Sequence, residues 1–483
     1  MKSLIALFSI SLLLSAFLVP VTRWLFLKFG KLDLPDARKM HSVAVPRSGG
    51  LAIIGAYLLS VAILALLPAS GNQVLERYTS FLIHLMPATA IIFATGFLDD
   101  WQNLKPKYKI LGQLLASGMA YWAGVRLFDV APSWDWLGFA ATAFWLILCS
   151  NAFNLIDGTD GLAGTLTVVS SVGLIIVALS LDYYPLALVF APLLGATLPF
   201  LRANWPPANL FLGDTGSLTL GFLIGCGGAT LARRFPEGGG LTAAILILTL
   251  PLMEVALSTA RRLLRGQPIF EADSFHIHHQ LKRQGLDSSR VLWRLGAVTL
   301  LGTAIAIAQI RTGPWERVFL VVPFLLLLGH DVTRLRYPEF AVLGEALLGG
   351  RFRIWLRQQI RLRSMENELM ATDEFEKSCQ ILEKYARQIG VLELNVFLNG
   401  MRFKSRVLKA DLPSAFTIRI DLPLHSWVNF RVPTGDPSTE APSAAYASAL
   451  MRIFTALRLA RLQRQKAVFP DFSVEVLALD RSG

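Results

Sequence analysis

Long apolar segments recur from the N-terminus to about residue 335, and no other feature constrains the fold as strongly. A helix that crosses a bilayer needs about 20 mostly apolar residues, and its backbone must satisfy its own hydrogen bonds. Because 53% of the residues are hydrophobic and 17% are charged, the chain is too apolar for an ordinary soluble protein. The sequence predicts an all-α polytopic membrane protein with about eleven transmembrane helices, near 3–25, 48–68, 80–98, 110–128, 136–153, 163–181, 185–201, 210–232, 242–263, 291–310 and 316–333.

Lysine and arginine residues are distributed unequally between the connecting loops. Loops near 23–47, 99–109, 154–162, 202–214 and 261–294 carry 17 of them, and the alternate loops carry 6. Cytoplasmic loops are enriched in Lys and Arg, so the first set is predicted to face the cytoplasm, with the N-terminus outside. The net charge of +12 then reflects topology, and we expect no nucleic-acid partner.

The character of the sequence changes after Arg334. We divide the chain into a transmembrane domain, 1–335, and a cytoplasmic C-terminal domain, 336–483, which is predicted to be small, soluble and α+β. A helix is expected near 374–389, strands at 391–398, 416–422 and 427–432, and a basic helix near 443–466. The basic amphipathic stretch 351–363 fits a helix on membrane lipids and a solvated helix equally well. No catalytic motif is evident here, so we expect this domain to dock or modulate.

An acidic pair, Asp99-Asp100, ends the third predicted helix and is followed by Asn103 and Lys109. Ionisable groups beside a membrane span are costly and are therefore functional candidates. Such a pair could bind a metal, act as a base or orient a phosphate-binding lysine. The alternative is a helix end that is charged only for topology.

A second polar segment, Asn151-Ala-Phe-Asn154-Leu-Ile-Asp157-Gly158-Thr-Asp160-Gly161, follows an apolar helix. It supplies oxygen ligands and a backbone that can approach a substrate closely. The segment is too short for an EF-hand loop and lacks its terminal Glu. A plain turn between helices is the alternative.

A third segment, from Asn209 to Ser217, contains Phe211 and Asp214. The following helix begins here, so its free amides could bind a phosphate, and Asp214 is a hard ligand suited to magnesium. Phe211 offers a stacking face for a base, or is equally well a core or lipid-facing residue.

The longest inside loop contains Arg265, Asp273 and the cluster His276-Ile-His278-His279. Three histidines within four residues of a regular helix cannot all face one ion, and no cysteine is near, which argues against zinc. Hydrogen bonds to a diphosphate or a sugar suit the cluster better. A purely structural role is the alternative.

These clusters all fall on the predicted inside face, where together they describe a pocket for Mg²⁺ and a polyanion. Phosphoryl transfer is the reaction that such a pocket serves. A transporter or flippase is the alternative, because carboxylates within membranes also mark ion pathways. That alternative predicts acidic residues at mid-membrane depth in broken helices.

Over residues 1–335 the motifs resemble the polyprenyl-phosphate N-acetylhexosamine-1-phosphate transferases, in the family's order. They are Arg38-Lys39-Met40-His41 with Pro46-Arg47-Ser48-Gly49-Gly50, then Asp99-Asp100 with Asn103 and Lys109, the Asn154 to Gly161 segment, Gly213-Asp214-Thr215-Gly216, and His276-Ile277-His278-His279.

The resemblance implies specific roles for these residues. Asn154 and Asp214 would hold Mg²⁺, or Mn²⁺ in its place, against the UDP diphosphate. Gly158, Asp160 and Phe211 would line the uracil pocket. Asp99 or Asp100 would handle the acceptor phosphate, with Lys109 beside it, so we expect the acidic pair and Asp214 to serve separate halves of the site. The histidines would contact the donor sugar, and the remaining substrate-binding candidates are Arg47, Asn103, Asp157 and Arg265.

The HxHH form is similar to the N-acetylglucosamine branch of that family, whereas the histidines of the lipid I translocase run together. Ser274 stands where the family often has a basic residue, which leaves the donor sugar open. The resemblance implies transfer of a sugar 1-phosphate from a UDP-sugar to undecaprenyl phosphate, with release of UMP, in the bacterial inner membrane. The product would start a cell-surface glycan such as O-antigen, and a homodimer is one assembly we consider.

Overall fold

The computed structural model describes most of the first 340 residues and parts of the following hundred. The described residues are 2–30, 32–33, 44–66, 72–235, 239–267, 275–335, 337, 339–340, 360, 363–365, 367–369, 371–372, 375–388, 391–398, 401–406, 415–422 and 426–433. They form two compact units. The first comprises Met1–Ala260 and Phe270–Leu335, and the second comprises Arg261–Ile269 and Arg336–Gly483.

The first unit is a bundle of helices, and a helix is present at every position where the sequence predicts a span. The helices are α1 (Lys2–Lys28), α2 (Gly49–Leu66), α3 (Asn72–Gln102), α4 (Pro106–Trp122), α5 (Asp135–Ile156), α6 (Leu162–Ser180), α7 (Tyr184–Asn204), α8 (Gly213–Arg234), α9 (Gly239–Ile247), α10 (Thr249–Arg265), α11 (Ile277–Arg283), α12 (Ser288–Gln309) and α13 (Pro314–Arg334). A short 3₁₀ helix, η1 (Pro132–Trp134), precedes α5.

The predicted number of eleven spans is not confirmed. Among the described residues, seven helices are long and apolar enough to cross a membrane, and the bent pair α9 and α10 makes an eighth if it counts as one span. Of the remaining predicted spans, α2 and α4 have 18 and 17 residues, and α13 carries charged residues towards both ends. The protein is nevertheless a multi-pass membrane protein.

One predicted span, near 242–263, is wrong as a single straight helix. The chain forms α9 and α10 instead, which meet at a 77° bend. The sequence holds one sign of the bend: Pro251 has no N–H to donate to the carbonyl of Ile247, four residues earlier, where α9 ends. The C-terminal end of α10, from Arg261, is already part of the second unit.

Helix α8 is the centre of the first unit and packs against α2, α3, α5, α6 and α9. Small residues let these helices approach closely. A Cβ on Gly50 in α2 would lie 2.2 Å from the backbone nitrogen of Gly216, and one on Gly221 would lie 2.5 Å from the carbonyl oxygen of Cys149. The start of α8 therefore lies directly against α2 and α3, which positions the candidate site.

The second unit contains α16 (Phe375–Gln388) and a four-stranded antiparallel sheet. Its strands are β3 (Glu393–Leu398), β4 (Met401–Arg406), β5 (Ala415–Leu422) and β6 (Ser426–Pro433), in the order β4-β3-β6-β5. Leu394, Val396 and Val428 are buried. The predicted helix and three strands are present, and β4 was not predicted. The expected helix near 443–466 lies outside the described residues, as does 351–363 apart from Ile360 and Arg363.

The contact between α3 and α8 gives a stability prediction. A Cβ on Gly96 would lie 2.5 Å from the carbonyl oxygen of Asp214 and 2.7 Å from Cα of Thr215. These are backbone atoms that cannot move aside, so Gly96→Ala should lower the free energy of unfolding by about 1–3 kcal/mol. Gly118→Ala is the control, because Phe139 at 3.9 Å is its nearest neighbour. Thermal unfolding in detergent compares the two, and a Gly96→Ala protein as stable as wild type would contradict the packing argument.

Candidate active site

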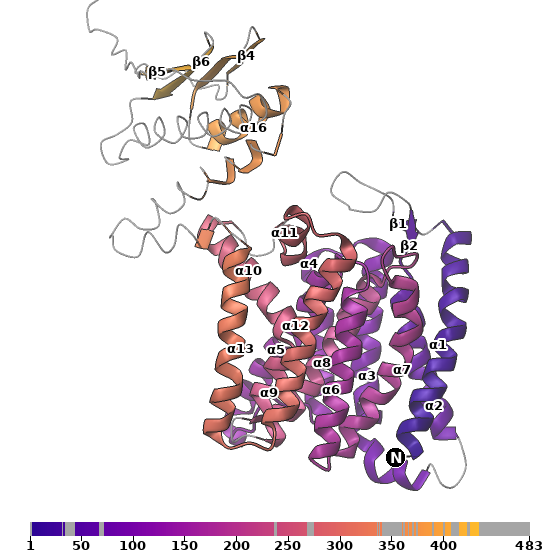
Figure 1. Cartoon of the computed structure of the whole chain (residues 1–483). Helices are drawn as coiled ribbons and strands as arrows, with labels where there is room; N and C mark the ends of the chain where they lie inside the picture. The colour runs from indigo at the N-terminus through magenta and orange to yellow at the C-terminus, as the bar shows by residue number, and fades with distance from the viewer. Residues whose placement is uncertain are drawn as a thin grey trace, which may run out of the picture. The chain divides into compact units, whose positions relative to one another are not determined.

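Polar segments that are far apart in the sequence meet at one end of the helix bundle. In Figure 1 this end carries β1 (Leu32–Asp33), β2 (Val45–Pro46), the start of α4 and α11, and the chain's N-terminus lies at the opposite end. The ends of α3 and α5 and the start of α8 join there through hydrogen bonds. The clusters that the sequence placed on one membrane face therefore form one region.

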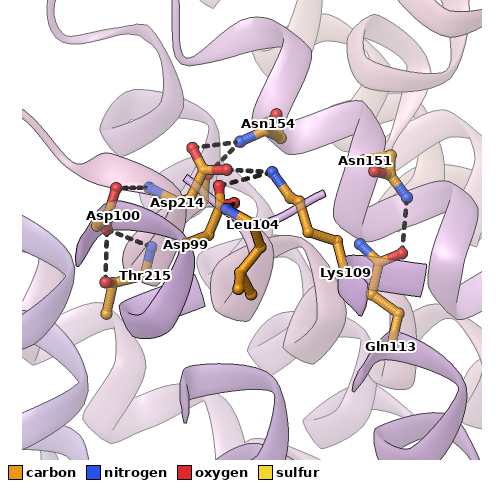
Figure 2. A network of polar contacts seen from close by, with 10 residues as sticks. Asp99, Asp100, Leu104, Lys109, Gln113, Asn151, Asn154, Asp214 and Thr215 are labelled. Carbon is orange, nitrogen blue, oxygen red and sulfur yellow. Dashed lines mark hydrogen bonds and ion pairs between the residues drawn. The ribbon is translucent and has the colours of Figure 1, made fainter. Parts of the chain in front are cut away.

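Lys109 is the central cation of this region. Its Nζ donates to Asp99 Oδ2 at 2.8 Å and makes a second, shorter contact with Asp214 Oδ2 (Figure 2). The three residues come from α3, α4 and α8, and each side chain is largely buried. The acidic pair and Asp214 were expected to occupy separate halves of the site. The structure instead places Asp99 and Asp214 on the same ammonium group.

Asn154, near the end of α5, holds the other oxygen of Asp214. Its Nδ2 donates to Asp214 Oδ1 at 3.0 Å and lies 3.0 Å from Ser217 Oγ (Figure 2). The amide nitrogen therefore faces Asp214, so in this arrangement Asn154 orients the carboxylate. We expected the two residues to hold a cation jointly, which would require the amide oxygen to face it.

Asp100 has a different task from its neighbour Asp99. Its carboxylate accepts hydrogen bonds from the backbone nitrogens of Asp214 and Thr215, at 2.9 and 2.8 Å, and from Thr215 Oγ1 at 2.6 Å (Figure 2). Gly213 precedes them with a φ of +75°, and a Cβ there would lie 2.7 Å from Asp100 Oδ2. Two of the helix amides that the sequence offers to a phosphate are thus bonded to Asp100, which caps α8.

The turn between α3 and α4 presents Lys109 to the carboxylates. Asn103 has a φ of +50°, a left-handed conformation that asparagine tolerates better than most residues, and it is exposed. Asp99 Oδ1 accepts from the backbone nitrogen of Leu104 at 2.8 Å. Pro106 then opens α4, as its fixed φ favours.

The Pro46 to Gly50 motif pairs with the segment before α8 through its backbone. Phe211 nitrogen donates to the carbonyl oxygen of Pro46 at 2.9 Å, and Gly49 nitrogen returns a bond to Phe211 at 2.9 Å. Arg47 forms an ion pair with Asp33 at 3.1 Å. This pairing sets where Phe211 and Arg47 lie relative to Asp214.

The Asp157 to Gly161 segment is held by specific bonds. Asp160 Oδ2 accepts from the backbone nitrogen of Ala208 at 3.0 Å, and Gly161 nitrogen donates to Asn204 Oδ1 at 2.8 Å. Burial, together with the carboxylate of Asp214, raises the pKa of Asp157 well above its usual range, while the Arg47 guanidinium acts in the opposite direction. Gly158 faces the histidine cluster, because a Cβ there would lie 2.9 Å from His278 Nε2.

The three histidines lie close together but have different surroundings. The rings of His278 and His279 are 4.2 Å apart between centroids. His276 is bonded to Glu254 of α10, His278 is almost completely buried, and His279 is partly exposed. Burial lowers the pKa of His279 to about 4 and that of His278 well below its usual range. Both rings are therefore neutral near pH 7.

Arg265 does not join this cluster. It lies in the second unit, where it forms an ion pair with the fully buried Glu339. Arg261, four residues earlier on the same helix, lies over the ring of Tyr337 with 4.4 Å to the centroid. The structure thus gives Arg265 a partner in the second unit, and its contact with substrate stays a prediction.

Sequence reasoning overlooked two polar features beside the site. Glu254 lies within an apolar run, where a single acid carried no motif. Gln113 follows Lys109 by one turn of α4, and its Oε1 accepts from Asn151 Nδ2 at 3.1 Å (Figure 2). Its position one helical turn after Lys109 is the signal that could have found Gln113, whereas Asn151 belongs to the polar segment that the sequence singles out.

Comparison with known proteins defines the family. Residues 82–231 match the model of glycosyl transferase family 4. The chain is 30% identical over 335 residues to a probable undecaprenyl-phosphate N-acetylglucosaminyl 1-phosphate transferase of Bacillus subtilis, a match that covers 68% of this chain and 90% of that protein. The chain belongs to the polyprenyl-phosphate N-acetylhexosamine-1-phosphate transferases.

Two further relatives show the range of this transferase family. An undecaprenyl-phosphate alpha-N-acetylglucosaminyl 1-phosphate transferase of Yersinia pestis is 29% identical over 334 residues, covering 65% of this chain and 87% of that protein. A phospho-N-acetylmuramoyl-pentapeptide-transferase of Pelotomaculum thermopropionicum is 30% identical over 332 residues, covering 62% and 94%. The present transferase is therefore an enzyme of sugar-phosphate transfer, and the flippase alternative is set aside.

The residues of the transferase site can be tested against the chemistry of Mg²⁺. This ion prefers oxygen ligands and usually takes one or two carboxylates together with substrate phosphates. Asp99 and Asp214 supply two carboxylates at one place. Within the described part of the chain, no three His, Cys, Asp or Glu side chains are placed to hold a metal. The donor set fits Mg²⁺ that is shared with a substrate diphosphate.

The different tasks of Asp99 and Asp100 predict different mutant behaviour. Asp100→Asn replaces a carboxylate that accepts three hydrogen bonds at the start of α8, so it should lower the free energy of unfolding by about 1–3 kcal/mol. Asp99→Asn keeps the acceptor for Leu104 and leaves the α8 cap intact, so its loss of stability should be smaller. Thermal unfolding of both variants measures this, and equal losses would show that Asp100 has no special capping role.

The neutral histidines predict how stability depends on pH. The folded pKa of His279, about 4, lies below the usual value of about 6.5, so the unfolded chain binds more protons between these values. The contribution of the neutral ring is full above pH about 6.5 and is lost as the pH falls towards about 4. His279→Gln should therefore show a shallower loss of thermal stability across that window than wild type. Parallel curves for the two proteins would contradict the shifted pKa.

Proposed function

We propose that this transferase moves N-acetylglucosamine 1-phosphate from UDP-N-acetylglucosamine to undecaprenyl phosphate and releases UMP. The observation that carries the proposal is the position of Lys109 between Asp99 and Asp214 at one end of the membrane bundle. A cation flanked by carboxylates, with the polar Asn154 to Gly161 segment beside it, can receive a diphosphate and a second phosphate. The cytoplasmic face of a bacterial inner membrane is the proposed location, because the site lies on the face with the excess of Lys and Arg.

The proposed reaction is a direct displacement. An oxygen of the lipid phosphate attacks the β-phosphorus of the donor, the bond from that phosphorus to the bridging oxygen breaks, and UMP leaves with the bond's electron pair. A phosphate dianion is already a nucleophile, so no proton has to be removed from it. Mg²⁺, held by Asp214, would neutralise charge on the diphosphate.

The side chains of the site have proposed roles that follow from their contacts. Lys109 is a cation placed to stabilise charge on the transferring phosphoryl group, and Asp99 holds its ammonium in place. Asn154 orients Asp214 through its amide nitrogen. Asp100 acts indirectly, because it fixes the start of α8 and therefore the position of Asp214.

The donor sugar is proposed from two kinds of support. The Bacillus subtilis and Yersinia pestis relatives are named for N-acetylglucosaminyl 1-phosphate transfer, and the His276-Ile277-His278-His279 form is similar to that branch. The relative from Pelotomaculum thermopropionicum, named for a different donor, has the same 30% identity. Overall identity does not distinguish the donors, so a panel of UDP-sugars is part of the test.

The test is UMP release by the purified protein with Mg²⁺, undecaprenyl phosphate and a panel of UDP-sugars. Lys109→Met should lower the rate by about 100-fold or more, because it removes a preorganised charge from the reacting phosphates. Lys107→Met is the matched control, because this exposed lysine lies over the ring of Tyr108 and should leave the rate unchanged. No UMP release with any UDP-sugar, or equal rates for the two variants, would refute the proposal.

A further inference from the structure

Glu254 is a buried carboxylate for which neither the motifs nor the family roles account. It lies on α10, beyond the 77° bend that separates α10 from α9, and only 2% of it is exposed. A buried carboxylate is costly unless it is fully hydrogen-bonded. Its partners therefore indicate why it is tolerated.

Both oxygens of Glu254 are directed at the start of the histidine cluster. Oε2 accepts from the backbone nitrogen of Ile277 at 2.9 Å, and Oε1 lies 2.8 Å from His276 Nδ1. Ser258, one turn further along α10, lies 3.3 Å from the same Oε1. One side chain from α10 thus bonds to the first residue of α11 and to the histidine before it.

These contacts fix which nitrogen of His276 carries the proton. An ionised carboxylate has no proton to donate, so the hydrogen in the bond between Glu254 and His276 belongs to Nδ1. In the neutral ring, Nε2 is then left with a lone pair as an acceptor. The hydrogen-bond partner of Nδ1 thus determines whether Nε2 donates or accepts a hydrogen bond.

The fixed ring is part of the candidate site. The rings of His276 and His278 are stacked, with 5.7 Å between centroids and 14° between planes. His278 in turn lies against Gly158 of the Asn154 to Gly161 segment. The orientation of His276 therefore sets the packing of a cluster that adjoins the loop assigned to the donor.

We propose that Glu254 is a positioning residue for sugar-phosphate transfer: it fixes His276 with its proton on Nδ1 and presents Nε2 as an acceptor for a hydroxyl or amide proton of the donor sugar. The role of Nε2 rests on the proposed function, whereas the protonation of Nδ1 does not. Glu254 acts through His276 and need not touch the substrate.

Two substitutions separate this role from a purely structural one. Glu254→Gln keeps the size of the side chain. If its oxygen continues to accept from Ile277, its NH₂ group faces His276 Nδ1 and forces the proton onto Nε2. Glu254→Asp is shorter, but it remains an acceptor only and preserves the tautomer. A structural role predicts that the glutamine variant is the milder change, and the tautomer role predicts the reverse.

The first measurement is nitrogen NMR of the full-length protein without substrate, labelled at its seven histidines, with His276→Gln used to assign the signal. Wild type should show a protonated Nδ1 and an unprotonated Nε2 on His276, and Glu254→Gln should show the reverse. An unprotonated Nδ1 or a protonated Nε2 in wild type would overturn the proposal without any variant. This readout does not depend on which sugar the enzyme transfers.

The second measurement is steady-state UMP release, with kcat and KM for the donor separated. Glu254→Gln should lower kcat/KM by about 10–100-fold, the usual effect of losing a residue that orients a functional histidine, and Glu254→Asp should retain more activity than Glu254→Gln. Ser258→Ala leaves both oxygens of Glu254 in place but removes a hydroxyl 3.4 Å from His276 Nδ1, so it should have a smaller effect than Glu254→Gln. A glutamine variant with wild-type kinetics, or one more active than the aspartate variant, would overturn the proposal. If wild type transfers no sugar phosphate, the proposed function fails while the tautomer result stands.

Discussion

The ion pairs between Lys109 and two carboxylates are the interaction on which the rest of the site depends. Asp99 and Asp214 come from helices more than a hundred residues apart in sequence, and their negative charges would repel each other in a partly buried place without a cation between them. The single positive charge of Lys109 lies between them and reduces this repulsion. A divalent ion bound together with a diphosphate would contact the same carboxylate oxygens. The position of Lys109 therefore determines the net charge of the site.

Close helix packing makes this meeting of charges feasible. Glycines in α2, α3 and α8 remove the side chains that would keep the helices apart, and Gly96 brings α3 against the backbone of Asp214. Because α3 and α8 lie this close, the carboxylate of Asp100 reaches the first backbone amides of α8 and caps the helix. The two neighbouring acids thus have different roles. Asp99 contacts Lys109, and Asp100 holds the start of α8, which carries Asp214.

Glu254 of helix α10 holds one end of the histidine cluster in place. Glu254 bonds His276 and Ile277 within the first unit, and further along α10, Arg265 is paired with Glu339 in the second unit. The three histidines have different surroundings. His276 is held by a carboxylate, His278 is buried against Gly158, and His279 is partly exposed with a low pKa.

The sequence by itself determined which segments are helical, because hydropathy is a local property and each apolar run must satisfy its backbone within the membrane. It also singled out Asp99, Asn154 and Asp214 as candidate site residues, since charged and amide side chains beside spans are rare and costly, and the structure brings the three together. It missed β4, although the Asn-Gly dipeptide at 399–400 is a hairpin signal, and it missed the bend after α9, although Pro251 lies just beyond the break and is a helix-breaking signal. Only the tertiary structure decided that Asp100 caps α8, that Lys109 joins Asp99 to Asp214, and that Glu254 holds His276. Each of these is a contact between residues distant in sequence, and its existence depends on how closely the helices pack, which no local pattern encodes.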